Sequence, residues 1–156
     1  MFGAKRRGLT LESELVHKLL TLAQKFQVNP HFIYYKKHAK MNSEEIRNYC
    51  IAKKHTTESF PFGEYSLVFK VAGKMFALLD LEAELRMNLK CDPAYAIQLR
   101  EKYASIHPGY HMNKKHWNTI YFDGTLSREL VFKLVDHSYD LVVGKLPKNR
   151  RIAFGL

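Results

Sequence analysis

The sequence predicts an α+β protein in two layers: an antiparallel sheet with helices packed on one face, in the order α-β-β-β-α-β-β-α. Apolar residues recur at helical spacing near the start, the middle and the end of the chain, and strand-like alternation fills the stretches between them. The 156 residues suffice for one continuous core. Ten Phe and nine Tyr residues supply much of its apolar area.

The first half of the chain contains two predicted helices. Residues 10–27 carry apolar side chains at helical spacing, and residues 29–40 show no period and are predicted to form a linker. Asn42 is predicted to be the N-cap of the next helix, because Glu45 stands at the position from which its side chain can reach back. Residues 53–55 are basic and are expected in the last turn of that helix.

Strand signals begin after residue 58. Residues 66–71 and 74–79 predict a hairpin with Gly73 in its turn, and residues 114–123 alternate as a further strand. Residues 85–90 alternate without a fault, so one set of side chains should be buried and the other should point to an open sheet face. The buried set is Leu85, Met87 and Leu89, and the open set is Arg86, Asn88 and Lys90.

Two more helices complete the predicted order. Asp92 followed by Pro93 is typical of a helix start, with Asp as N-cap and Pro in the first turn. The last helix is expected to begin near Ser127 and to end at Gly144 and Pro147.

The positive charge of the chain is concentrated at its two ends. The net charge is +10, of which residues 1–40 contribute +6 and residues 141–156 contribute +4, so residues 41–140 are neutral overall. A basic protein favours a polyanionic partner. The neutral body means that such a partner must be held by local clusters of cations.

The two cysteines, Cys50 and Cys91, fit neither a metal-ligand spacing nor a disulfide framework. We expect a reduced protein in the cytoplasm. The sequence contains no run of about 18 apolar residues, so we expect no membrane span.

Several segments resemble the MmcQ/YjbR family. They are Phe60–Glu64, Phe69–Leu78, Leu89–Pro93, Pro108–Thr119, Asp136–Tyr139 and Leu146–Lys148. The resemblance covers about residues 41–151, and the run His-Met-Asn-Lys-Lys-His-Trp-Asn at 111–118 is its most specific part. It implies a CyaY-like, secretion-chaperone-like fold. Members are usually called DNA-binding proteins, and no catalytic residues are attached to that description.

Residues 1–40 fall outside this resemblance, which leaves residues 41–156 as the predicted family domain. Two interpretations stay open: a basic N-terminal extension, or a start codon assigned too far upstream, with Met41 as the true start. The capping signal directly after Met41 favours the second.

The strongest candidate site is the segment 109–118. It combines cations for phosphates, amides for base edges and rings for stacking. Trp117 has an equally good interpretation as a packed residue, whereas Lys114 and Lys115 are expected to be exposed. The candidate DNA-binding residues of this segment are His111, Asn113, Lys114, Lys115, His116 and Trp117.

Two further basic regions are candidates. Arg86 and Lys90 lie on the open face of the predicted strand 85–90, and Lys70 would extend this strip if it shares the face; a merely solvated face is the alternative. The tail from Lys145 to Arg151 carries four basic residues, among them Lys148, Arg150 and Arg151, and no acid, and it either binds phosphates or keeps the end soluble.

The sequence predicts no enzyme, cofactor or metal site. It contains no nucleophile motif, phosphate-binding glycine loop or paired carboxylates. His107, His111 and His116 have no carboxylate or cysteine at ligand spacing. The expected function is weak, largely sequence-independent binding of duplex DNA. The alternative is a protein-interaction module, whose binding should depend little on salt.

Overall fold

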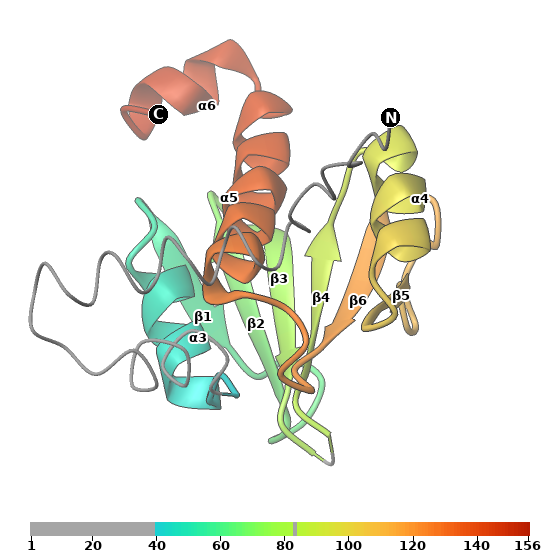
Figure 1. Cartoon of the computed structure of the whole chain (residues 1–156). Helices are drawn as coiled ribbons and strands as arrows, with labels where there is room; N and C mark the ends of the chain where they lie inside the picture. The colour runs from blue at the N-terminus through green and yellow to red at the C-terminus, as the bar shows by residue number, and fades with distance from the viewer. Residues whose placement is uncertain (1–39, 83) are drawn as a thin grey trace, which may run out of the picture. The chain divides into compact units, whose positions relative to one another are not determined.

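The computed structural model describes residues 40–82 and 84–156, which lie within one unit, Lys40–Leu156 (Figure 1). The predicted helix over 10–27 and, apart from Lys40, the predicted linker and basic extension lie outside the described residues. The described elements are α3 (Ser43–Ile51), β1 (Thr56–Ser59), β2 (Ser66–Val71), β3 (Lys74–Asp80), β4 (Arg86–Lys90), α4 (Pro93–Lys102), β5 (Ile106–Pro108), β6 (Trp117–Tyr121), α5 (Arg128–Gly144) and α6 (Lys148–Ala153).

The sheet is antiparallel throughout, with strand order β1-β2-β3-β4-β6-β5. Helices α3, α4 and α5 cover one face of it (Figure 1). Buried residues of these helices and of that sheet face form one apolar cluster. The predicted α+β class with helices on one face is therefore confirmed.

Each predicted helix in the described region begins where its capping residue indicated. The side chain of Asn42 accepts a hydrogen bond from the Glu45 amide, and that of Asp92 accepts from two amides of the first turn of α4. Ser127 caps α5 in the same way, through the amide of Leu130. These bonds satisfy amide groups that have no partner within the helix.

The β2–β3 hairpin is also confirmed. Its two turn residues, Ala72 and Gly73, have φ values of 48° and 76°. Positive φ at both central positions is the type I′ geometry, whose twist matches that of the flanking strands.

The register predicted for residues 85–90 is correct, with two exceptions in burial: Leu85 precedes β4 and is only partly buried against the core, and Asn88 is not open to solvent. Met87 and Leu89 lie in the core under the helices, and Arg86 and Lys90 point to the opposite face. Asn88 also points to that face but is buried, with 7% of its surface exposed. The reason is that the loop around Tyr110 lies over it.

Other expectations need correction. Strand β1 and helix α6 were not predicted, and α3 ends at Ile51, so residues 53–55 lie beyond its last turn. Strand β6 begins at Trp117, because the side chain and carbonyl of Asn113 hold the residues before it in a turn. The short, polar sequence of β1 carries little hydrophobic pattern, which explains why it was missed.

Candidate functional site

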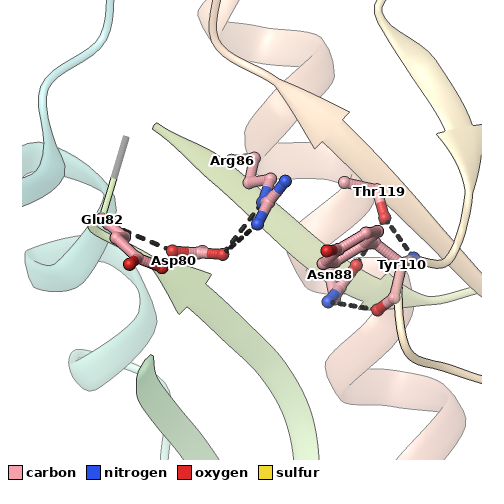
Figure 2. Close-up of polar contacts among 6 residues, drawn as sticks. All are labelled: Asp80, Glu82, Arg86, Asn88, Tyr110 and Thr119. Carbon is pink, nitrogen blue, oxygen red and sulfur yellow. Dashed lines mark hydrogen bonds and ion pairs between the residues drawn. The ribbon is translucent and has the colours of Figure 1, made fainter. Parts of the chain in front are cut away.

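The uncovered face of the sheet holds the first group of candidate residues (Figure 2). Arg86 donates to Asp80 Oδ2 from Nε and Nη2, at 2.9 and 2.7 Å. Its guanidinium also lies 4.3 Å from the centre of the Tyr110 ring. The hydrogen bond to Asp80 raises the pKa of Arg86. Arg86 is therefore committed to an internal ion pair, and its charge is neutralised within the sheet face.

Asn88 and Thr119 hold the loop that covers this part of the face. Thr119 Oγ1 donates to Asn88 Oδ1 at 2.6 Å and accepts from the Tyr110 amide at 2.8 Å. Asn88 Nδ2 donates to the Tyr110 carbonyl at 3.2 Å. Figure 2 shows the side chains of Asn88 and Thr119 reaching the backbone of Tyr110. Both backbone polar groups of Tyr110 are thus bound to side chains of neighbouring strands.

The same loop is packed closely at its start. A Cβ atom on Gly109 would lie 2.7 Å from Trp117 Cβ and 2.9 Å from Met112 Cβ, closer than such atoms approach. His111 adopts a left-handed conformation, with φ of 53°, which turns the chain back toward the sheet. Residues 109–112 therefore form a closely packed loop wall against the sheet.

A pocket of about 310 Å³ lies between this wall and the β1–β2 loop. Phe62 projects from the β1–β2 loop with 67% of its surface exposed. The pocket combines apolar and polar groups, and its lining residues are Phe62, Ser66, Met75, Leu78, Asp80, Asn88, Tyr110, His111 and Met112.

A lysine cluster stands at the end of the sheet where β4 ends and β3 begins. It consists of Lys74, Lys90 and Lys145, which come from β3, β4 and the C-cap of α5. Burial lowers the pKa of Lys90, and the nearby charges of Lys145 and Lys74 lower it further. Within residues 40–82 and 84–156, none of the three forms an ion pair.

The backbone and the side chain of Lys90 each make one further contact. Its amide donates to Ser138 Oγ at 2.8 Å, and its ammonium lies 5.3 Å from the centre of the Trp117 ring. Lys70 lies opposite Met75 in the hairpin and so shares the uncovered face, as the predicted strip required.

The segment 113–117 divides into structural and exposed residues. Asn113 binds the Lys115 amide through its side chain, and Trp117 has only 7% of its surface exposed. Trp117 is therefore packed under the loop and cannot stack on a nucleic acid base, which corrects that candidate role. His116 is half-buried, whereas Lys114 and Lys115 are exposed as expected.

Sequence reasoning missed Arg100, which positions this segment from α4. Its guanidinium donates to Asn118 Oδ1 at 2.7 Å and to the carbonyls of Lys114 and Trp117 at 2.5 and 3.1 Å. The exposed position of Lys114 therefore rests on an arginine that is distant in sequence.

The basic tail is helical. Lys148 and Arg150 are exposed on α6, and the Arg150 guanidinium lies 5.9 Å from the centre of the Phe154 ring. Arg151 is half-buried, and its Nε has no hydrogen-bond partner among the described residues. Two of the three predicted tail residues are thus accessible to a ligand.

The described residues contain no group of three or more His, Cys, Asp or Glu side chains placed to hold a metal ion. In the same part of the chain, no helix has the length and apolarity needed to cross a membrane.

A six-stranded antiparallel sheet, with helices on one face and a loop-walled pocket on the other, defines the structural class of this protein. The chain belongs to the YjbR family, whose profile matches residues 51–141. The family expected from the sequence is therefore confirmed.

Bacterial relatives and a solved structure agree with this assignment. Uncharacterized protein YjbR of Escherichia coli K12 is 34% identical over 112 residues, which cover 71% of this chain and 95% of the relative. Uncharacterized protein YbdF of Escherichia coli O157:H7 is 44% identical over 93 residues, covering 57% and 74%. The crystal structure of Deinococcus radiodurans protein DR2400 matches with a TM-score of 0.70 and 42% identity, over 75% of this chain and 90% of that one.

Proposed function

We propose that this protein binds DNA weakly and with little sequence preference, through phosphate contacts at the lysine cluster. The observation that carries the proposal is that Lys74, Lys90 and Lys145 gather from three separate elements without an ion-pair partner among the described residues. Like charges placed together repel each other, and a bound polyanion removes that repulsion.

Other candidate cations lie at the same end of the sheet. Lys90 is the register partner of Trp117, so Lys114 and Lys115 stand just before the start of β6, next to the end of β4. Helix α6, with Lys148 and Arg150, begins three positions after Lys145. These positions support a continuous basic surface. They take the place of Arg86 as candidate phosphate contacts, because Asp80 already neutralises the charge of Arg86.

The proposal is one of binding without catalysis. Burial raises the pKa of the Cys50 thiol to about 12 and that of the Cys91 thiol to about 11, so neither is a ready nucleophile. Two buried free thiols also favour the reducing cytoplasm, where DNA is available.

A matched pair of double variants tests the proposal. Lys74→Ala/Lys145→Ala removes two charges from the lysine cluster, and Lys102→Ala/Lys133→Ala removes two from exposed positions on α4 and α5. Affinity for a labelled duplex is measured by fluorescence anisotropy over a range of salt concentrations. The first variant should flatten the log–log salt dependence by about 2, roughly one per lost phosphate contact. Equal effects of both variants would contradict the assignment to the cluster.

One observation favours a second function, a protein-interaction module. Phe60, Phe62 and Tyr65 of the β1–β2 loop expose 51%, 67% and 49% of their surfaces. Exposed apolar residues that gather in one loop are typical of docking sites. Binding through them should persist at high salt, whereas phosphate binding should not.

A further inference from the structure

Two lysines lie beside the pocket on the uncovered face. Lys70 is the register partner of the lining residue Met75, and Lys90 follows the lining residue Asn88 by two positions on the same face. At the rise of a β-strand, two residues span about 7 Å. A ligand that fills the pocket therefore has the ammonium groups of Lys70 and Lys90 on its own face, and neither lysine forms an ion pair within residues 40–82 and 84–156. Lys74, the register partner of the core residue Val71, belongs to the covered face.

The lining of the pocket suits a flat, uncharged group with polar edges. Met75, Leu78 and Phe62 give it apolar surface. The backbone of Tyr110 is hydrogen-bonded to Asn88 and Thr119, and its ring lies against the Arg86 guanidinium. The charge of Asp80 is neutralised by Arg86.

Polar groups remain available for the edge of such a ligand. Tyr110 takes one of the two hydrogens on Asn88 Nδ2, and the second is a donor. Asp80 and Ser66 add acceptors. The volume of about 310 Å³ is at the small end of the range for ligand pockets, about 300 to 1,000 Å³, which suits one base.

We propose, on the basis of the DNA-binding function proposed above, that this pocket takes one unstacked base of a single DNA strand whose neighbouring phosphates lie on Lys70 and Lys90. The charge at the rim matches a phosphate, and the apolar lining matches the faces of a base. Because a paired base cannot leave its stack without a penalty, unpaired DNA should bind more tightly than a duplex.

The test compares two ligands with the same number of phosphates: a short oligo(dT) and an abasic oligomer of equal length. Affinities of the full chain for both are measured by fluorescence anisotropy. The wild-type protein should bind oligo(dT) more tightly. Phe62→Ala should weaken oligo(dT) binding by about 5-fold to 150-fold, the effect of removing one stacking side chain, and leave abasic binding unchanged.

Phe60→Ala is the matched control, because Phe60 lies on the same loop and is 51% exposed but does not line the pocket. It should bind both ligands as the wild type does. Tyr110→Ala is a second test from the opposite wall. It keeps both backbone bonds of the loop, and a thermal melt checks that it folds.

The outcomes separate the two proposals. Equal affinity of the wild type for oligo(dT) and the abasic oligomer would overturn the base pocket and leave phosphate binding intact. Failure to bind either ligand at low salt would overturn DNA binding itself. An apolar peptide that binds in a Phe62-dependent way without displacing oligo(dT) would make the pocket a protein-docking site and overturn the base assignment.

Discussion

Side chains on the two faces of strand β4 are buried in different ways, although both faces belong to the same five residues. On the covered face, Met87 and Leu89 are buried by helices through non-directional apolar contact. On the uncovered face, Asn88 is buried by a loop and is held by hydrogen bonds of fixed geometry. The loop that forms the pocket wall is therefore held by the sheet itself, because its backbone is hydrogen-bonded to side chains of β4 and β6.

The largest effect should come from the covered face. Met87 has 0% of its surface exposed, so Met87→Ala leaves a cavity in the core and should lower the free energy of unfolding by about 2 to 5 kcal/mol. Urea denaturation measures this change. Met87→Leu, which nearly conserves volume, should lower the free energy by less than about 1.5 kcal/mol. If Met87→Leu loses as much free energy of unfolding as Met87→Ala, then side-chain shape and not volume determines the stability of the covered face.

The second effect concerns the uncovered face. Asn88→Ala leaves the hydrogen of the Thr119 hydroxyl without its acceptor and the Tyr110 carbonyl without the Asn88 donor, and it should lower the free energy of unfolding by about 1 to 3 kcal/mol.

A double-mutant cycle of Asn88→Ala with Thr119→Val tests whether the pair acts as one unit. We expect a coupling energy of about 0.5 to 3 kcal/mol, because the two side chains share one network. Hydrogen exchange at the Tyr110 amide should speed up in Thr119→Val, which lacks the acceptor of that amide. Strictly additive losses would show that the loop is held by packing alone.

The sequence predicted the covered face better than the uncovered one, for a physical reason. Met87 and Leu89 are apolar at period two, and Asn42, Asp92 and Ser127 cap their helices through local bonds, so short windows of sequence contain the information.

The uncovered face depends on contacts between residues far apart in the chain. Asn88 looked like a solvated residue, and its burial follows from a loop that begins about 20 positions later. Lys74 stands alone in the sequence and gave no signal, whereas Lys145 was recognised only as part of the basic tail, and the fold brings both near Lys90. The exposed position of Lys114 was predictable, since lysine is seldom buried.

The smallest effect on stability is expected for substitution of Lys90, which lies on the uncovered face of β4 and belongs to the lysine cluster. Burial and the charges of Lys145 and Lys74 hold the pKa of Lys90 below its usual value of about 10.4, so its charge destabilises the folded state at neutral pH. Lys90→Met keeps the apolar stem and removes that charge. At pH 7 the variant should melt slightly higher than the wild type and should bind DNA more weakly.

The sign of the pH dependence distinguishes this explanation from a simple gain in apolar packing. In the wild type, the destabilisation caused by the Lys90 charge is fully present below the folded-state pKa of Lys90 and is relieved as the pH rises through that pKa. The difference in melting temperature between the variant and the wild type should therefore shrink toward pH 10, whereas a packing gain would stay constant. Lys133→Met, an exposed lysine on α5, controls for the loss of one positive charge. If it raises the melting temperature as much as Lys90→Met does, the effect belongs to net charge and not to the lysine cluster.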